Sequence, residues 1–595
     1  MPPIIPRQAV QATDGATEDA PTSTGRYGRR QLLAAAGIGA AAATVTSAPL
    51  GALSASAAPR TATRTPKAVR APAARAVTAT TTPTAIPPAP SVRPSLTTTP
   101  QLTAARPVVK RPVLLQAPAV VAATSPLPNL AGTDPVWHVL RRATFGPTPQ
   151  LVADVRAMGT AAWIEQQLAP AAINDSACDA YLTRYPTLGK TTPQIRSMIA
   201  QYSWDAMTDL VRGTVARALW SKRQLFEVMV EFWSNHFNIA TPTGEVWDLK
   251  PVDDWKVIRA NALGRFADLL QASAKSPAML RFLDNDDSSV DTLNENYGRE
   301  LLELHTVGID AGYTHAMVID SARLVTGYTI GRHGEFAYYN DWRYVGPVTV
   351  LGFTHPNSDD FDGLHVAEKY LDYLAHHPPT AHHIATKLAV RFVSDDPPAT
   401  LVDALAAAYL ANDTAIVPVL RALFASPEFA ASIGQKTRRP VEDVIGTARM
   451  LGTAPAAGDR GSLSSLQWVL GGLGQAPLAW VPPDGYPDTT SAWMSTAGTL
   501  GRWNAHLGLV QNWWKDGLTT PTPAAALGGT PAAACGALVD QISLRVLGFR
   551  LSAAQRAAIL AFLPATETTS SADAVSWRLD LLFALVLDSP NWISR

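Results

Sequence analysis

Apolar residues recur every three or four positions along most of the chain after residue 135. In the segment 210–237, the residues of one apolar face are Leu225, Phe226, Met229, Val230 and Trp233. From Ile384 onwards the same spacing continues to the end of the sequence. This period is that of amphipathic helices, each of which buries one face. We therefore predict a mainly α-helical protein, built as a multi-helix, bundle-like array.

One segment, 336–353, departs from the helical pattern. Its apolar and polar residues alternate, and it is rich in tyrosine and valine. A two-residue period with β-branched and aromatic side chains is typical of a strand that buries one face. We predict a small β-hairpin excursion near this segment within the otherwise helical fold.

The segment 294–308 combines an apolar side with an unusual number of polar groups. Leu301, Leu302 and Leu304 suit a packed interior, whereas the remaining positions include two amides, three carboxylates, a guanidinium and an imidazole. Buried polar groups cost free energy unless each of them finds a partner. A helix with this composition therefore needs either internal partners or a ligand.

The spacing of these polar residues is compatible both with internal partners and with a ligand. Glu295, Arg299 and Glu303 stand four residues apart and can form a ladder of ion pairs along one helix face. Asn296 and Glu300 form a second row beside them. In the alternative interpretation, the carboxylates, an amide and the imidazole converge on a ligand and form the wall of a pocket.

A second polar pair, Asn235 and His236, stands at a predicted helix end within the aromatic-rich segment 232–237. A single histidine among aromatic residues is usually hydrogen-bonded within a core, but side chains at a helix end can also face a cleft. We therefore treat both residues as candidates for a site shared with the segment 294–308.

The N-terminal residues predict export. Arg29 and Arg30 precede a weakly apolar run rich in alanine and glycine, and the triplet at 55–57 fits a small-residue cleavage site. The run is too short and too rich in alanine to be a stable transmembrane span. We predict that residues 1–57 are a twin-arginine signal peptide, recognised by the twin-arginine export machinery, and that the mature protein is secreted or extracytoplasmic.

The charges are distributed unevenly. Residues 58–130 contain nine basic residues, no acidic residue and no aromatic residue, so they lack the apolar surface that folding requires. We predict a disordered basic linker rich in proline, threonine and alanine. The whole chain has 49 basic and 49 acidic residues, but residues 1–133 hold 13 basic and only 3 acidic ones. The remainder is therefore acidic, which argues against a nucleic-acid-binding surface.

The cysteine and histidine residues do not form a recognised catalytic or metal motif. Cys178 and Cys535 could form one disulfide in an exported protein or remain two buried thiols. Four histidines lie close together in the segment 376–383, yet no cysteine or closely placed carboxylate completes a zinc-binding spacing. We assign no metal ligand and no cofactor from these patterns.

Six short segments resemble, in this order, the bacterial family DUF1800, a domain of unknown function. The segments are 138–146, 232–237, 294–304, 322–328, 387–395 and 485–493. The resemblance implies a largely helical, exported protein and brings no established reaction. We divide the ordered part accordingly into a DUF1800-like helical core, 131–515, and a C-terminal helical segment, 516–595, packed on it.

The first functional hypothesis is an exported enzyme, a carboxylate-based hydrolase or lyase that acts on an extracellular glycan or another cell-wall polymer. Glu300 and Glu303 are its candidates for general acid and base, and His236 is a third catalytic candidate. The candidates for substrate binding are Asn235, Asn296, Tyr297 and Arg299. Such residues could equally support β-elimination on a uronate, with arginine or asparagine neutralising its carboxylate.

The second hypothesis is a non-catalytic binding or assembly protein of the cell envelope. The polar helix would then be a structural hydrogen-bond network that fixes how helices pack. An enzyme needs these side chains to open onto a cleft, whereas a scaffold needs them sealed and mutually paired. The three-dimensional arrangement of the candidate residues therefore discriminates between the two hypotheses.

Overall fold

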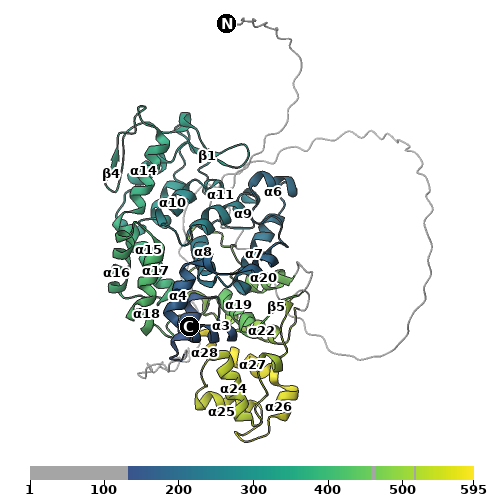
Figure 1. Cartoon of the computed structure of the whole chain (residues 1–595). Helices are drawn as coiled ribbons and strands as arrows, with labels where there is room; N and C mark the ends of the chain where they lie inside the picture. The colour runs from purple at the N-terminus through teal and green to yellow at the C-terminus, as the bar shows by residue number, and fades with distance from the viewer. Residues whose placement is uncertain (1–131, 457–461, 515–517) are drawn as a thin grey trace, which may run out of the picture. The chain divides into compact units, whose positions relative to one another are not determined.

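A computed structural model describes residues 132–456, 462–514 and 518–595 of the chain. These residues form 27 α-helices and three two-stranded antiparallel sheets (Figure 1). The predicted mainly α-helical fold is therefore confirmed. The predicted signal peptide and linker, residues 1–57 and 58–130, lie outside the described residues.

The first third of the fold consists of helices of moderate length. They are α2 (Pro135–Ala143), α3 (Pro149–Met158), α4 (Thr160–Leu168), α5 (Ser176–Leu182), α6 (Thr192–Met198), α7 (Asp205–Trp220) and α8 (Gln224–His236). The helical pattern of 210–237 thus belongs to two helices, α7 and α8. The chain turns at Ser221, where the backbone is extended, and the Gln224 amide donates to the carbonyl oxygens of Ala218 and Ser221.

Two π-helical turns interrupt the middle of the fold. The elements are α9 (Lys250–Asp253), the π-helix η3 (Asp254–Arg259), α10 (Phe266–Ala274), α11 (Pro277–Phe282), α12 (Asn296–Glu300), the π-helix η4 (Leu301–His305) and α13 (His315–Leu324). The polar segment 294–308 is therefore one helix from residue 296 to residue 305, and its second half is a π-helix. Such turns are rare and frequently mark functional sites.

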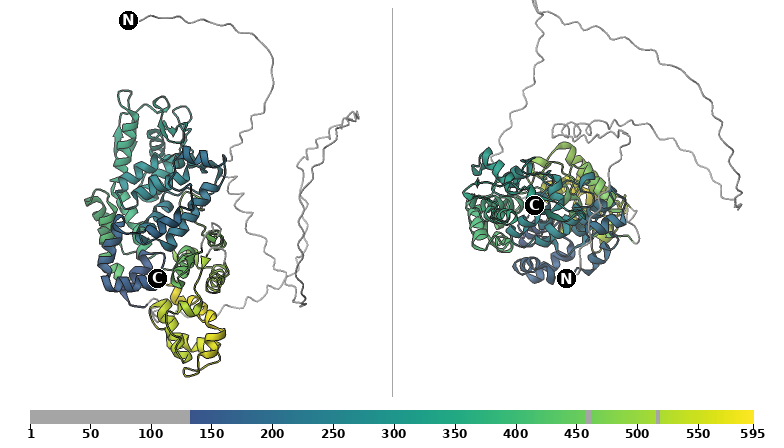
Figure 2. Two further views of the ribbon diagram at one scale, coloured as in Figure 1. Left: turned by 45° about the vertical axis from the view of Figure 1, so that its right-hand side comes forward. Right: turned by 90° about the horizontal axis from the view of Figure 1, so that it is seen from above.

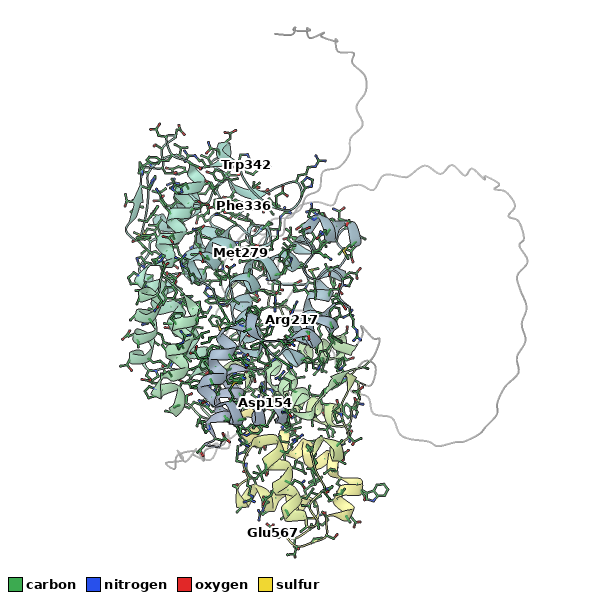
Figure 3. The ribbon with its side chains drawn as sticks, viewed as in Figure 1. Asp154, Arg217, Met279, Phe336, Trp342 and Glu567 are labelled. Atoms are coloured by element: carbon green, nitrogen blue, oxygen red, sulfur yellow. The ribbon has the colours of Figure 1, made fainter. Side chains whose placement is uncertain are left out.

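The predicted β-excursion is present as two hairpins. Strand β1 (Tyr328–Ile330) pairs with β2 (Phe336–Tyr338), and β3 (Val348–Val350) pairs with β4 (Phe353–His355). Strand structure thus begins before residue 336 and ends after residue 353. Figure 3 shows Phe336 and Trp342, which belong to this excursion, at the end of the fold opposite to Glu567.

The second half of the chain is helical again, apart from the short pair β5 (Ala454–Pro455) and β6 (Leu518–Thr519). Its first helices are α14 (Gly363–Ala375), α15 (Pro378–Phe392), α16 (Ala399–Ala411), α17 (Ile416–Ala425), α18 (Pro427–Ala431) and α19 (Pro440–Leu451). The next are α20 (Ser462–Gly472), α21 (Thr490–Trp493), α22 (Thr496–Val510) and α23 (Pro523–Ala526). Helices α15, α16 and α17 pack side by side along one flank (Figure 1).

The last helices gather at one end of this fold, as the left view of Figure 2 shows in yellow. They are α24 (Cys535–Leu547), α25 (Ala553–Phe562), α26 (Ala572–Trp577), α27 (Leu579–Leu587) and α28 (Pro590–Ile593). Helix α27 packs on α22, and the backbone of Arg595 exchanges hydrogen bonds with that of Lys436. The C-terminal segment thereby joins the core that contains α19.

The two cysteines and the apolar helices were also considered in the sequence. Cys178 and Cys535 are both buried and do not form a disulfide with each other. Among the described residues, no helix has both the length and the apolar character that a bilayer crossing requires.

A buried histidine, His506 of α22, links three helices. Its Nδ1 lies 2.8 Å from the Asp588 carboxylate, and its Nε2 lies 3.1 Å from Asp443 of α19. Burial acts to lower the pKa of His506, but the two carboxylates outweigh this effect and raise the pKa to about 9. The imidazole is therefore a cation that joins two acidic side chains inside the fold.

We expect this link to make stability depend on pH in the alkaline range. An unfolded histidine titrates near about 6.5, so the stabilisation is fully present below that pH and is lost as the pH rises through about 9. This increase in the pKa of His506 corresponds to a loss on the order of 3 kcal/mol in the free energy of unfolding at alkaline pH. Urea unfolding of wild type and His506→Gln at a series of pH values measures it. If both proteins lose stability in parallel between neutral pH and pH 9, His506 does not have this role.

Candidate functional site

One face of the 296–305 helix is committed to local structure. Arg299 forms an ion pair of 3.1 Å with Glu295, whose carboxylate also lies 3.7 Å from His315. The Asn296 side-chain amide donates to the backbone carbonyl of Leu283 at 3.2 Å. Of the predicted substrate-binding residues, Arg299 thus pairs within the first turn of its own helix, and Asn296 ties the helix to the end of α11.

Glu300 and Glu303 both lie within electrostatic range of Tyr313. Burial raises the pKa of the Tyr313 hydroxyl, and the negative charges of Glu303 and Glu300 raise it further. The positive charge of Arg299 opposes this increase. Glu300 is almost completely buried, whereas Glu303 is half-buried. The two predicted acid–base residues are therefore neighbours of each other and of Tyr313.

His305, the last residue of the π-helix η4, lies against His236. The ring centroids of His236 and His305 are 6.2 Å apart, and Tyr297 lies at the same distance from His305. A third imidazole, His383 of α15, is also 6.2 Å from His236. The structure thus brings together His236 and Tyr297 from the predicted set with His305, the imidazole of the pocket-wall interpretation, and with His383, which was not predicted as a site residue.

The π-helix η4 positions His305 in this group. The Thr306 hydroxyl donates to the carbonyl oxygen of Leu301 at 2.6 Å, which closes the widened turn. The backbone then turns at Gly308, which has a φ of +83° and approaches His383 so closely that a Cβ atom would lie 3.0 Å from its Nδ1. Glycine is required there both for the backbone conformation and for the space.

Burial makes the three imidazoles neutral at physiological pH. It lowers the pKa of His236 far below its usual value, that of His305 to about 3 and that of His383 to about 4. The positive charge of Lys387 is the next cause for each of them. A lysine side chain therefore lies close to all three rings.

Lys387 is the most unusual ionisable residue of this group. It follows His383 and precedes Arg391 by one turn each on α15, so the three side chains form a stripe on one helix face. Burial lowers the pKa of its amine to about 8, against the opposing charges of Asp484 and Asp488. No carboxylate among the described residues lies within ion-pair distance, and part of the residue is still accessible to solvent.

Several polar atoms in this cluster have no hydrogen-bond partner among the described residues. They are Nδ1 of His236, both ring nitrogens of His305, Nε2 of His383 and the hydroxyl of Tyr297. Buried polar atoms of this kind call for a bound water or ligand. Within the described part of the chain, however, no group of three histidine, cysteine or acidic residues is arranged to hold a metal ion.

We call His236, His305, His383, Tyr297 and Lys387 the imidazole–lysine cluster. It combines neutral imidazoles with an amine whose pKa burial lowers to about 8, and groups of this kind can accept and donate protons near physiological pH. The sequence offered a signal for Lys387 in the segment 387–395, one of the six that resemble DUF1800. Its spacing of four residues from His383 is a second signal.

Asn235, which adjoins His236 in sequence, has a different role. Its side-chain amide donates to the carbonyl oxygen of Tyr486 at 2.7 Å and accepts from the Tyr486 backbone N–H at 2.7 Å. Asn238, one turn further on, donates to the carbonyl oxygens of Trp480 and Pro482. The end of α8 therefore clamps the loop 480–488, which carries the two aspartates nearest to Lys387.

This clamp predicts a strong effect of Gly485→Ala. Gly485 has a φ of +76°, and a Cβ atom there would lie 2.1 Å from the backbone oxygen of Asn235. We expect a loss of at least about 2 kcal/mol in the free energy of unfolding, from backbone strain and displacement of the loop. Gly189→Ala is the control, because its φ is also positive at +70° but nothing lies within 4 Å. Thermal unfolding and limited proteolysis compare the two variants. If Gly485→Ala and Gly189→Ala lose the same stability, the contact of Asn235 with the loop 480–488 does not have this role.

Beyond Lys387 the α15 stripe leads into a group of buried ion pairs, which we call the ion-pair cage. Its cations are Arg391, Lys436, Arg439 and Arg595, and its carboxylates are Glu231, Asp395, Glu442 and Asp488. Arg439 binds Glu231 through both terminal nitrogens at 3.0 and 2.9 Å, and Lys436 lies 3.4 Å from Asp488. The cage holds Asp488 near Lys387.

Neither of two cavities outside the cluster contains the predicted catalytic residues. The first, of about 50 Å³, lies between α7, α8 and α19 and is lined in part by Glu231, Asn235 and Asp254. It has room for water but not for a sugar ring. The second, of about 380 Å³, lies between η3, α10 and the turn of the β1–β2 hairpin. It is lined in part by Lys256 and Phe336.

The fold and this site define a mainly α-helical protein with two groups of ionisable side chains in its interior. The family model described as "Protein of unknown function (DUF1800)" matches residues 138–594. The chain therefore belongs to the DUF1800 family. The match includes most of the predicted core and continues through the C-terminal helices. No match is found among curated proteins or among solved structures.

Proposed function

We propose that the protein is an enzyme that removes a proton from its substrate at the imidazole–lysine cluster. One observation carries the proposal: Lys387 is surrounded by protein, has no ion-pair partner among the described residues, and has a pKa lowered to about 8. Lysines in this state act as general bases or nucleophiles, because a useful fraction of the amine is neutral near physiological pH. Structural lysines are normally paired or exposed.

The reaction class that fits this set is β-elimination on an acidic glycan. A base takes the proton from the carbon beside a uronate carboxylate, and the electron pair of that C–H bond forms a carbon–carbon double bond. The glycosidic oxygen leaves and is protonated in turn. Lys387 would act as the base, and the Tyr297 hydroxyl would deliver a proton to the leaving oxygen. The proton held by Lys387 then restores the Tyr297 hydroxyl.

The substrate class rests on two further observations. The paired arginines at 29–30 support twin-arginine export and hence a polymer outside the cytoplasm. The loop beside Lys387 carries a row of half-buried aromatic rings, with centroid distances of 5.0 Å from Trp480 to Tyr486 and 6.0 Å from Tyr486 to Trp493. Aromatic faces of this kind suit the apolar faces of sugar rings.

A screen on polysaccharides tests the proposal. Purified protein is incubated with uronate-containing and neutral polysaccharides, and both new reducing ends and ultraviolet absorbance of an unsaturated product are recorded. We expect unsaturated products from an acidic polymer only. Glu300→Gln and Glu303→Gln should keep most of this activity, because these carboxylates lie near Tyr313 and outside the imidazole–lysine cluster. Reducing ends without unsaturation, lost in Glu300→Gln, would instead support the carboxylate-based hydrolase.

A binding or assembly protein of the cell envelope is the second candidate. The observation in its favour is that His236 and His305 are each only 1% exposed. Arg299, Asn296 and Asn235 also have structural partners. This candidate predicts retention on an immobilised polysaccharide without turnover, and equal retention of Lys387→Met and wild type. Turnover of any glycan that depends on Lys387 would exclude it.

A further inference from the structure

The cavity of about 380 Å³ described above, which we call the hairpin cavity, has the size of a small-molecule binding site. Its walls come from the start of α6, from η3, from the junction of α10 and α11, and from the turn of the β1–β2 hairpin. No residue of the imidazole–lysine cluster lines it. The hairpin cavity is therefore a second place where a ligand can bind, apart from the proposed reaction.

Direct contacts hold the hairpin turn against α6. Nη1 of Arg196 donates to the carbonyl oxygen of Arg332 at 3.2 Å, and Nε of Arg196 lies 2.6 Å from the carboxylate of Asp248. Gly334 packs on Thr192 so closely that a Cβ atom at Gly334 would lie 2.4 Å from the methyl carbon of Thr192. The cavity is thus formed by the fold itself before any ligand enters.

The buried charged groups of the wall are already paired. Nζ of Lys275 lies 2.5 Å from the carboxylate of Glu368. The carboxylate of Asp253 lies 2.6 Å from Nζ of Lys250 and accepts a hydrogen bond from the Ser276 hydroxyl at 2.7 Å. Burying a charged ligand without a free counter-ion costs free energy. These pairs therefore favour a neutral ligand over an anion or a cation.

Two charged side chains of the wall are exposed to solvent. The ammonium group of Lys256 lies 5.2 Å from the centroid of the Trp255 ring, and Trp255 does not line the cavity. One oxygen of Glu335 accepts a hydrogen bond from the backbone N–H of His333 at 2.9 Å. Since Lys256 and Glu335 are both exposed, water already solvates their charges. Neither supplies a desolvated charge that would select an ionic ligand.

Uncharged polar groups and an aromatic ring remain for a ligand. Thr192 is only 3% exposed and lines the cavity, and its hydroxyl has no hydrogen-bond partner among the described residues. The neutral imidazole of His333, which is exposed, donates one hydrogen bond and accepts another. Phe336, labelled in Figure 3, is half-buried in the wall. A sugar ring matches this combination, because its hydroxyls donate and accept while its C–H face packs on an aromatic ring.

We propose that the hairpin cavity binds a neutral hexose unit of a glycan. The apolar face of the sugar packs on Phe336, and its hydroxyls bind Thr192 and His333. This inference goes beyond the proposed elimination, because it concerns binding without reaction and a sugar without a carboxylate. It does not depend on Lys387, so either proposal can fail without the other.

Ligand-observed NMR and calorimetry with single sugars test the proposal. Glucose, galactose, mannose and N-acetylglucosamine are titrated into the full chain, with glucuronate as the charged counterpart of glucose. We expect at least one neutral sugar to bind with a Kd on the order of 1 mM, and glucuronate to bind at least about tenfold more weakly. Glucuronate binding as tight as that of the best neutral sugar, or no binding of any of the four neutral sugars, would overturn the proposal.

Three variants test whether the sugar lies in the hairpin cavity. Ala272→Leu should abolish binding, because Ala272 lines the cavity and the added carbons fill it. Phe336→Ala should raise the Kd about tenfold through loss of the stacking surface, and Thr192→Val should raise it by a smaller factor. Phe361→Ala is the matched control, because Phe361 is 43% exposed and does not line the cavity, so this variant should bind sugar as the wild type does. Undiminished binding by Ala272→Leu would overturn the proposal even if Phe336→Ala does not fold.

Discussion

Replacing Glu442 with glutamine should lower the free energy of unfolding by about 3–5 kcal/mol. The carboxylate of Glu442 is the acceptor shared by Arg391, Arg439 and Arg595, all of them buried. Burial opposes its ionisation, but these three cations outweigh burial and hold its pKa well below the usual value. Glutamine keeps the shape and removes the charge, so three guanidinium groups would be left without their common counter-ion.

Urea unfolding at neutral pH measures this loss, and Glu165→Gln is its control. Glu165 also binds an arginine through two hydrogen bonds, to Arg421 at 2.7 and 2.8 Å, but both side chains are 51% exposed. Solvent screens such a pair, so its loss should lower the free energy of unfolding far less than the loss of Glu442 does. If Glu442→Gln and Glu165→Gln were equally stable, burial would not be the reason that the ion pairs of the cage contribute to the free energy of unfolding.

Replacing Lys387 with methionine should reduce turnover of the acidic glycan by about 10²–10⁴-fold, the usual contribution of a positioned base. Methionine fills a similar volume without an amine, so folding should be little affected. In the wild type, kcat/KM should rise with pH up to a plateau above about 8, because the base acts only when the amine is neutral. Lys387→Arg should also be inactive, since its guanidinium keeps its proton.

Lys256→Met is the control for this substitution, because Lys256 is an exposed lysine of η3 outside the imidazole–lysine cluster. It should keep the wild-type pH profile, and circular dichroism should show that both methionine variants are folded. A Lys387→Met protein with undiminished kcat/KM would remove the base from the mechanism. A profile that falls between pH 7 and pH 9 would mean that the protonated amine is the active form.

The helical architecture was predictable because it depends on local periodicity. The positions Leu225, Met229 and Val230 are buried in α8 as their spacing indicates. The break between α7 and α8 was not predicted, since the apolar pattern continues across it and the Gln224 hydrogen bonds that fix the turn have no periodic signature. The π-helices were missed for a similar reason.

The candidate site was predictable only in part. Asn235 and His236 were taken as one unit because they are adjacent, but neighbouring residues of a helix point about 100° apart. One of them clamps the loop at Tyr486, and the other enters the imidazole–lysine cluster. The cluster itself joins residues far apart in the chain, such as His236 and His383. Such a contact depends on how the helices pack, which one sequence does not show.

The charged residues of the ion-pair cage, and Arg142 of α2 near it, could not be predicted from the sequence either. Arg142, Arg439 and Glu442 have the composition of an ordinary solvated helix surface, and nothing in their spacing distinguishes them from exposed charges. Their burial follows from the position of α2 and α19 beneath the C-terminal helices. The balance of 49 basic and 49 acidic residues therefore gives no hint of the dense group of paired charges inside the fold.

The π-helix η4 has an evolutionary consequence. A turn with hydrogen bonds between residues five apart holds one residue more than an α-helical turn, so η4 corresponds to a single-residue insertion into a regular helix. Such an insertion leaves the residues before it in place, here the ion pair of Arg299 with Glu295, and rotates those after it by about 100°. One added codon would thus be enough to bring an imidazole at His305 against His236 while the turn that contains Arg299 and Glu295 keeps its place.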